Sequence, residues 1–387
     1  MGEQMKNALS NDVLQKRKNI RTDDFRGPYY RDTTAILHSS AFRRMKHKTQ
    51  VFFAPSNDHI CTRMEHALHV SSIASSICKG LGLDDELAWA IGLGHDLGHT
   101  PFGHIGEIIL SRMMKEQGLG IFEHEVHSLR VVDFLSQHGE GMNLTYAVRD
   151  GIVSHCGESF QQYIKPSHQL KDFTKIKEKK GLIPSTWEGV VVRFSDSIAY
   201  LGRDWEDACR LNVIQKKDLP SDVRDILGDS NSTIIDTLVR DLVKTSKEEK
   251  GICLSDTMFQ AIQKMKEYNY THIYRSPMLQ GYEKYYTRLL HLIADYLHYL
   301  YKEFKKDLTG YESEKNMLAY GFGRYVVDME EAYLLHDGNT KRLVYDYIAG
   351  MSDNFAQDCA YEILVPKHLN DSIEYSLGGK WFNKNDD

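Results

Sequence analysis

The sequence predicts a mainly α-helical protein. Apolar residues recur every three or four positions through most of the 387-residue chain, which is the period of an α-helix. The strict alternation of apolar and polar residues that marks a half-buried strand is rare, and only 8 prolines interrupt the helical pattern. We therefore expect an all-α fold, in a chain long enough for one large domain or two ordinary ones.

The composition is that of a folded protein and excludes several other classes. Hydrophobic residues make up 41% and charged residues 26% of the chain, which argues against disorder. The apolar stretches are far shorter than the roughly 18 to 20 residues of a membrane span, so we expect no membrane partner. The net charge of -6 excludes a general positive field for nucleic acid. The six cysteines form no CxxC pair, which argues against disulfides and thiolate zinc and indicates the cytoplasm.

The first predicted helix with a chemical signal spans Met64 to Cys78. His66, Val70 and Ile73 fall on one stripe of this helix, because residues three or four positions apart share a face. Two glycines follow and predict its end. His66 is therefore expected on the buried face.

A second helix is predicted to begin at a cap on Asp84 or Asp85 and to end near Gly98. Its apolar stripe includes Ile91 and leads to His95, so this histidine should also point into the core. A single histidine on an apolar face is usually a hydrogen-bonded core residue, and that reading stays open for each of the two histidines taken alone.

The third helix is predicted from Trp187 to Arg210. One side is strongly apolar, while Asp196, Tyr200 and Asp204 share a polar face at a spacing of four residues. Asp196 needs a partner, because an unpaired carboxylate beside an apolar face would be costly to bury. That partner is either a bound cation or Arg193, one turn earlier.

A lysine-rich stretch precedes the third helix. Residues 165–180 contain six lysines, which is typical of a solvated loop or helix face and less commonly of a contact for phosphate or nucleic acid. We interpret residues 158–186 as an insertion in a core domain of residues 1–210. Residues 211–387 are predicted to form a helical C-terminal region packed on that core.

Histidines cluster in the first third of the chain. The members of the cluster are His59, His66, His69, His95, His99, His104, His124 and His127. His95 is followed directly by Asp96, and both side chains can reach one ion only if the ion lies between their helix and a neighbouring helix. The preceding helix, which carries His66, is that neighbour. Imidazole nitrogens and carboxylate oxygens suit Mn²⁺, Fe²⁺, Co²⁺, Ni²⁺ or Mg²⁺, and Asp196 fits as the remaining acidic ligand.

This pattern of His, His-Asp and Asp resembles that of the HD-domain phosphohydrolases. Three stretches are similar to the deoxynucleoside triphosphate triphosphohydrolases, which include the bacterial dGTPases and the animal sterile-alpha-motif HD enzyme. These stretches are FRRMKHKTQVF (residues 42–52), TRMEH (62–66) and HDLGHTPFGHIGE (95–107). The resemblance runs from about Arg17 to Arg210 and continues weakly as IYRSPMLQ (273–280).

The resemblance implies an HD-domain helical phosphohydrolase fold with a helical C-terminal extension and one divalent metal ion. The implied metal ligands are His66, His95, Asp96 and Asp196. His104 is implied as the catalytic histidine, with Glu107 and His124 setting its tautomer and charge. Independently, His104 and Glu107 are three residues apart after a Thr-Pro break, which puts them on one side of a starting helix. Without the motif, His104 would be interpreted as an exposed loop histidine.

Five residues are implied to bind the substrate. Arg63 can offer a guanidinium fork to phosphate oxygens, with a helix-surface salt bridge as the alternative. His99 is implied to contact phosphate or to support the metal ligands. Gln50 and Asp204 are implied to bind a 3'-hydroxyl, and the Tyr200 ring to occupy the space of a 2'-hydroxyl. Ordinary core packing is the alternative for Tyr200.

The resemblance thus implies an enzyme that hydrolyses deoxynucleoside triphosphates, dGTP among them, to deoxynucleoside and inorganic tripolyphosphate. It also implies a homo-oligomer such as a hexamer, with a nucleotide or single-stranded DNA as an effector. Glu125, His127 and Arg203 depart from the family pattern and leave the base preference open. The alternatives are an HD phosphohydrolase acting on a nucleoside monophosphate, a cyclic nucleotide or guanosine tetraphosphate, and a nucleotide sensor without turnover.

Overall fold

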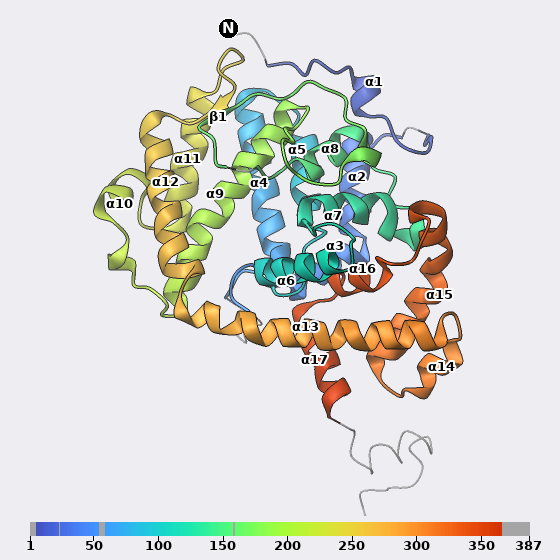
Figure 1. Cartoon of the computed structure of the whole chain (residues 1–387). Helices are drawn as coiled ribbons and strands as arrows, with labels where there is room; N and C mark the ends of the chain where they lie inside the picture. The colour runs from blue at the N-terminus through green and yellow to red at the C-terminus, as the bar shows by residue number, and fades with distance from the viewer. Residues whose placement is uncertain (1–4, 23, 54–58, 158, 366–387) are drawn as a thin grey trace, which may run out of the picture.

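The computed structural model describes residues 5–22, 24–53, 59–157 and 159–365 of the chain. These residues form seventeen α-helices and one small two-stranded sheet (Figure 1), which confirms the predicted all-α fold. Within the same ranges, none of the helices combines the length and the apolarity needed to cross a bilayer.

The N-terminal helices are α1 Asn11–Leu14, α2 Pro28–Leu37, α3 Ser40–Arg44, α4 Arg63–Leu81, α5 Asp85–Gly94, α6 Gly103–Glu116, α7 His124–Arg130, α8 Tyr146–Val153 and α9 Trp187–Arg210. The later helices are α10 Ser221–Leu227, α11 Asn231–Thr245, α12 Asp256–Asn269, α13 Pro277–Phe304, α14 Leu308–Ser313, α15 Met317–Asp337, α16 Leu343–Ala349 and α17 Asp353–Leu364. Short 3-10 turns are η1 Met45–His47, η3 Gln137–Gly139, η4 Phe173–Lys175 and η5 Lys216–Asp218, and π-helical turns are η2 Val131–Leu135 and η6 Tyr270–Tyr274. The sheet pairs β1 Tyr163–Ile164 with β2 Ile252–Cys253 in antiparallel register.

Helix α4 lies at the centre of the molecule and packs against both α5 and α9 (Figure 1). It contains the predicted Met64–Cys78 segment. Thr62 and Glu65 form a capping box at its start, and Gly82 ends it with a φ of 70°, a left-handed conformation that glycine adopts without strain. His66 is buried, as its helical stripe predicted.

Helix α5 begins at the predicted cap, Asp84, but ends at Gly94 rather than near Gly98. After Gly94 the chain continues in turns, because α7 lies directly against this segment. A Cβ on Gly98 of the turns would be 2.2 Å from the backbone nitrogen of Ser128 on α7. The Ser128 hydroxyl donates to the carbonyl of His95 and accepts from the N–H of Gly98. These side-chain bonds replace the helical ones, so His95 and Asp96 lie on a turn.

The third predicted helix is confirmed, since α9 spans Trp187–Arg210 with Thr186 as its cap. The lysine-rich stretch before it is mainly turns and loops with β1 and η4. The stretch is a loop, as interpreted from the sequence, but buried carboxylates bind two of its lysines. Lys171 pairs with Asp150 at 2.6 Å and Lys179 with Glu125 at 2.8 Å.

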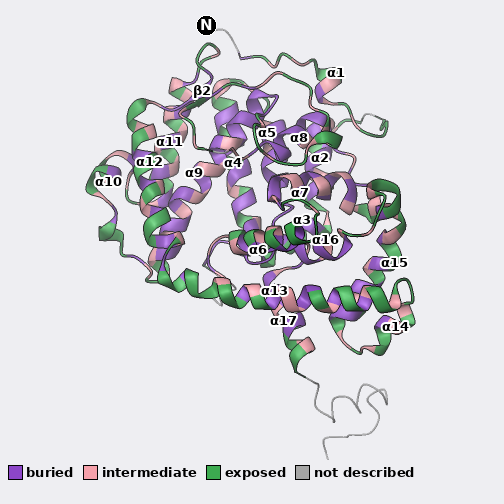
Figure 2. Cartoon of the chain, in the orientation of Figure 1, coloured by how far each residue is buried: buried purple, intermediate pink, exposed green. Residues whose placement is uncertain are grey.

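Two hydrophobic clusters form the core of the described residues. The first contains side chains of α4, α5 and α9 and extends through α10–α12 to Leu279. The second contains side chains of α6 and of α13, α15, α16 and α17, among them Leu110, Leu290 and Phe322. In Figure 2, α13 alternates between buried and exposed residues as it passes beneath α6. Helices α13 and α16 therefore pack on α6, and α10–α12 pack with α4 and α9, whereas the division at residue 210 stays a prediction.

Candidate active site

The four predicted metal ligands come together where α4, the turn after α5, and α9 meet. Nε2 of His66 lies 2.9 Å from Oδ1 of Asp196, and Nε2 of His95 lies 3.8 Å from the same oxygen. Oδ1 of Asp96 lies 3.5 Å from Nε2 of His95. His66, His95 and Asp96 are buried and offer ligand atoms that all lie within 4.8 Å of one another.

The orientation of His95 fits a ligand of a cation. Its Nδ1 lies 2.6 Å from the carbonyl oxygen of Gly92, so Nδ1 carries the proton and donates it. Nε2 then carries the lone pair, and this buried atom has no hydrogen-bond partner in the described part of the chain. Two imidazoles and two carboxylates form a donor set that a divalent ion could occupy. Burial raises the pKa of the nearby Cys156 thiol to about 12.

Asp196 contacts His66 rather than Arg193. The Arg193 guanidinium donates instead to the carbonyl oxygen of Leu182 at 3.1 Å. The alternative pairing of Arg193 with Asp196 is therefore wrong. The side chain of Asp196 therefore points from α9 toward His66 and His95.

Arg63 is buried beside this group and is not a surface residue. Its Nη1 donates to Oδ2 of Asp96 at 2.6 Å, so the alternative of a helix-surface salt bridge is wrong. Its Nε and Nη2 are buried without partners among the described residues. Burial alone would raise the pKa of Asp96, but His95, His99 and Arg63 outweigh it and hold that pKa well below its usual value. Arg63 thus has two unused donors next to an ionised carboxylate.

His104, Glu107 and His124 form a second group, which we call the His104 group. His104 lies on the first turn of α6 and Glu107 on the next turn, with Nδ1 of His104 3.5 Å from Oε2 of Glu107. Nδ1 of His124 lies 3.1 Å from each Glu107 oxygen. His104 therefore lies on a helix, as predicted, although 71% of its side chain is exposed. Burial alone would lower the pKa of His124, but Glu125 and Glu107 raise it well above its ordinary value.

His99 connects the metal-ligand residues to the His104 group. Its Nε2 lies 3.3 Å from Oδ1 of Asp96. Its ring stacks on the ring of His124 with centroids 3.9 Å apart. Contacts between side chains therefore run without interruption from Asp96 to Glu107.

The predicted sugar-binding residues occupy two places. Asp204 accepts a hydrogen bond from the hydroxyl of Tyr274 at 2.6 Å, and burial raises the pKa of its carboxyl to about 7. Tyr200 is half-buried one turn before Asp204 on α9. Gln50 lies beside the turn that precedes His104, and its buried Oε1 has no hydrogen-bond partner among the residues that the structure describes. No hydrogen bond joins Gln50 to Asp204 within the described residues.

Several side chains at the site were missed by the sequence reasoning. His155, just after α8, donates from Nδ1 to the carbonyl of Ile152 at 2.6 Å and leaves a buried Nε2 without a described partner. Its ring centroid lies 4.9 Å from that of His95. The only sequence signal for His155 was a weak one, namely that His155 and Cys156 directly follow an apolar helical stretch.

Lys266 is a second missed residue. It lies on α12 with Nζ 4.0 Å from the ring centroid of Phe160 and 5.3 Å from that of Tyr200. Burial lowers its pKa to about 8, and no described carboxylate pairs with it. It lines a hollow of about 120 Å³ together with Asp196 and Tyr200. Only the folded chain brings α12 to α9, so no local pattern pointed to this lysine.

The three residues that depart from the family pattern have structural partners. Glu125 is buried against Lys179, and Nδ1 of His127 lies 3.7 Å from Oδ1 of Asp346. Arg203 donates to Glu206 at 3.3 Å.

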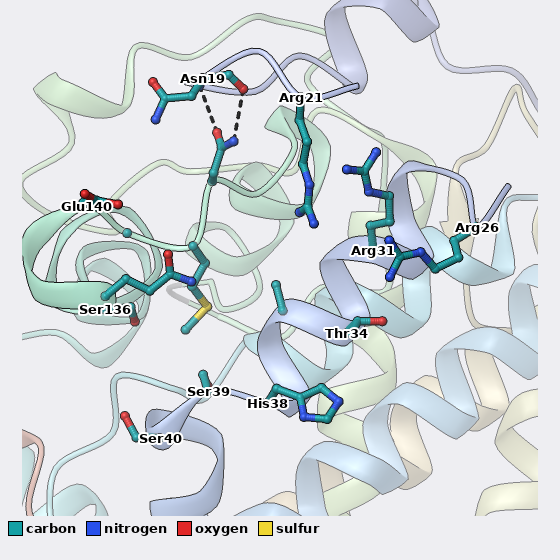
Figure 3. A pocket seen from close by; sticks show the side chains of 15 residues that line it. Asn19, Arg21, Arg26, Arg31, Thr34, His38, Ser39, Ser40, Ser136 and Glu140 are labelled. Carbon is teal, nitrogen blue, oxygen red and sulfur yellow. Dashed lines mark hydrogen bonds between the residues drawn. The ribbon is translucent and has the colours of Figure 1, made fainter. Parts of the chain in front are cut away.

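A separate hollow of about 680 Å³ lies away from these groups, between α2 and the segment after η2 (Figure 3). Across one edge, the backbone N–H of Asn19 donates to Oδ1 of Asn143, and Nδ2 of Asn143 donates to the carbonyl oxygen of Asn19. Arg26 and Arg31 reach it, but both already bind Asp24. None of the predicted site residues lines this hollow.

Family models match two parts of the chain. The HD domain matches residues 63–201, a range that includes His66, His95, Asp96 and Asp196. The phosphohydrolase-associated domain matches residues 252–362, which contain α12 to α16 and most of α17.

Curated relatives cover most of the chain. A deoxyguanosinetriphosphate triphosphohydrolase-like protein of Caldanaerobacter subterraneus is 37% identical over 91% of this chain and 88% of its own length. One of Desulfatibacillum aliphaticivorans is 37% identical over 88% of both chains, and one of Geobacter sulfurreducens 30% identical over 87% of this chain and 88% of its own. The chain is a member of the HD-domain family of deoxyguanosinetriphosphate triphosphohydrolase-like proteins.

Proposed function

We propose that the protein hydrolyses deoxynucleoside triphosphates, dGTP among them, to deoxynucleoside and inorganic tripolyphosphate. The observation that carries the proposal is the meeting of the metal-ligand residues with the His104 group through His99. The relatives' name, deoxyguanosinetriphosphate triphosphohydrolase-like, supports the substrate class.

The proposed cofactor is one divalent ion, Mn²⁺, Mg²⁺, Fe²⁺, Co²⁺ or Ni²⁺, held by His66, His95, Asp96 and Asp196. When bound, the ion supplies positive charge to an α-phosphate oxygen and makes a nearby water more acidic. The unpartnered Nε2 of His95 and the nearby carboxylates of Asp96 and Asp196 support this choice, because oxygen and imidazole ligands without thiolate suit these ions.

The chain's own residues bind the phosphates and move a proton. The unused N–H groups of Arg63 suit phosphate oxygens, and Lys266 adds a half-buried cation without a described carboxylate partner. The oxygen of a water molecule joins the α-phosphorus while the bond from that phosphorus to the 5'-oxygen breaks. One proton of that water is released to the solvent, and the other replaces, by way of the solvent, the proton that His104 gives. His104 gives a proton to the departing 5'-oxygen; Glu107 orients its ring and stabilises its charge, and His124 holds Glu107 in place. The exposure of His104 leaves it accessible to a substrate.

The proposed sugar recognition uses Tyr200, Asp204 and Gln50. Asp204 and the buried Oε1 of Gln50 are hydrogen-bonding groups suited to a 3'-hydroxyl. The Tyr200 ring leaves no space for a 2'-hydroxyl in this proposal. A nucleotide sensor without turnover would not require the contact between His104 and Glu107.

We also propose that the protein works in the cytoplasm as a homo-oligomer such as a hexamer, with a nucleotide or single-stranded DNA as an effector. All six cysteines are unpaired, which suits a reducing compartment. Exposed apolar side chains on α13, among them Met278, Tyr282 and Tyr285, are candidates for contacts between subunits. Sedimentation of the purified protein with and without nucleotide tests the assembly.

Incubation with each deoxynucleoside triphosphate in turn, with Mn²⁺ or Mg²⁺, tests the function. Ion-exchange chromatography of early time points should show tripolyphosphate and deoxynucleoside in equal amounts. Orthophosphate as the first product would contradict the proposal, and so would turnover restricted to monophosphates, cyclic nucleotides or guanosine tetraphosphate.

A further inference from the structure

Asp353, the first residue of α17, lies near the proposed active site although it is far from it in the sequence. Its buried Oδ1 accepts a hydrogen bond from the backbone N–H of Phe102 at 2.9 Å. Its Oδ2 accepts from the backbone N–H of Thr49 at 3.0 Å and also from the Thr49 hydroxyl. One carboxylate therefore joins two segments of the N-terminal region.

The first of these segments is the turn that leads to His104. Phe102 caps α6 with a φ of 64°, in the left-handed region that residues with a side chain rarely adopt. A strained conformation of this kind persists only where the surroundings hold it. Asp353 binds the backbone of Phe102, and the ring of Tyr286 stacks on its side chain with centroids 3.9 Å apart. Both supporting residues belong to the C-terminal helices.

The second segment carries Gln50. A Cβ on Gly103 would lie 3.3 Å from the Gln50 carbonyl oxygen and 3.6 Å from Nη2 of Arg63. The turn before His104 is therefore packed directly against this segment and against the Arg63 guanidinium. Asp353 binds both the turn before His104 and the segment of Gln50. Its carboxylate therefore fixes how His104, Gln50 and the adjacent Arg63 lie relative to one another.

Lys48 makes a parallel connection. Its buried Nζ donates to the carbonyl oxygen of His99 and, at 2.8 Å, to that of Ala349, the last residue of α16. Both connections reach the C-terminal region between residues 349 and 353. This stretch lies inside the match to the phosphohydrolase-associated domain and outside the match to the HD domain.

We propose that Asp353 is a positioning residue for the hydrolysis, which it serves by holding the left-handed turn at Phe102 and with it the place of His104. The inference rests on the proposed function, because it takes His104 as the proton donor. It gives the phosphohydrolase-associated region a direct part in catalysis. The predicted metal ligands all come from the HD domain, whereas the group that holds the turn does not.

The substitution Asp353→Asn tests this inference in the full-length protein. An amide can accept from only one of the N–H groups of Phe102 and Thr49, and it presents its own NH₂ to the other. We expect kcat to fall about 10- to 100-fold, while KM and bound metal stay within about twofold. Deuterium exchange in the peptide covering residues 99–107 should become faster, because the Phe102 amide then meets either a weaker, neutral acceptor or the amide NH₂. Asp307→Asn is the matched control, since Asp307 caps α14 in the same region by accepting from Thr309.

A second variant, Tyr286→Leu, removes the stacked ring and leaves Asp353 in place. It should lower kcat in the same direction with a smaller effect, and it decides the question if Asp353→Asn does not fold. An unchanged kcat or unchanged exchange in Asp353→Asn overturns the inference, as do equal changes in Asp307→Asn. If the wild-type protein hydrolyses no deoxynucleoside triphosphate, the proposed function fails. The exchange comparison then still decides whether Asp353 holds the turn.

Discussion

The metal-ligand residues and the His104 group lie side by side, yet they are held in different ways. His66 and His95 are 2% and 0% exposed; His66 lies on α4 and His95 directly after α5, and both helices belong to one hydrophobic cluster. The side chain of His104 is 71% exposed and lies on α6, whose apolar face belongs to the other cluster. Groups that need a fixed geometry thus lie inside one core, whereas the group that must reach a substrate lies at the junction of two cores.

The largest effect is expected from Asp196→Ala in the metal group. Losing a charged ligand leaves two imidazoles and one carboxylate, so the variant should lose its bound metal and fall below about a thousandth of wild-type activity. Elemental analysis of the purified protein measures the first effect. Glu206→Gln on the same helix, which removes a surface contact to Arg203, should keep both metal and activity. A full equivalent of tightly bound ion in the Asp196→Ala protein would remove Asp196 from the ligand set.

His104→Ala should separate the two groups. Because His104 is not a proposed metal ligand, this variant should keep its metal and its fold while kcat falls about 10²- to 10⁴-fold. His138, whose side chain is 78% exposed, offers a matched control as His138→Ala. Near-normal turnover of His104→Ala would show that His104 is not the proton donor.

These two groups also differ in how far the sequence could predict them. The metal-ligand residues lie on α4 and α9 or directly after α5, helices whose caps and apolar stripes can be read from the sequence, and α9 begins and ends where predicted. The predicted end of α5 was wrong because the Ser128 hydroxyl forms hydrogen bonds that replace the helical ones there, and Ser128 is far from α5 in the sequence. Lys266 and Asp353 were missed for the same reason. Each acts on residues that only the folded chain brings near, and such contacts leave no local pattern.

A smaller effect is expected at the predicted sugar site. A substrate without the 3'-hydroxyl leaves buried polar groups unpaired at a cost of about 1–3 kcal/mol, or roughly 5- to 150-fold in kcat/KM. Steady-state kinetics with dGTP, ddGTP and GTP measure this cost. Both ddGTP and GTP should be poor substrates, and Tyr200→Ala should improve GTP relative to dGTP. Equal turnover of GTP and dGTP by the wild-type protein would contradict the assigned role of Tyr200.

The smallest effect concerns stability and pH. Burial raises the pKa of Asp204 to about 7 in the folded protein, from 3.8 for the ordinary carboxyl. Between these values the folded state keeps a proton that the unfolded state releases, so this residue lowers stability as pH rises through that range. Asp204→Asn cannot ionise and should reduce the fall in Tm between pH 5 and 8 by about 2–4 °C in metal-free protein. An identical fall in the two proteins would show that Asp204 is ionised throughout.

The central claim is that water attacks the α-phosphorus and that tripolyphosphate leaves in one piece. Hydrolysis of dGTP in ¹⁸O-labelled water, followed by mass spectrometry of both products, tests it most directly. The label should appear in the tripolyphosphate, on the end that was the α-phosphate, and the deoxynucleoside should carry none. Label on the 5'-hydroxyl of the deoxynucleoside, or labelled orthophosphate as the first product, would contradict the proposed mechanism.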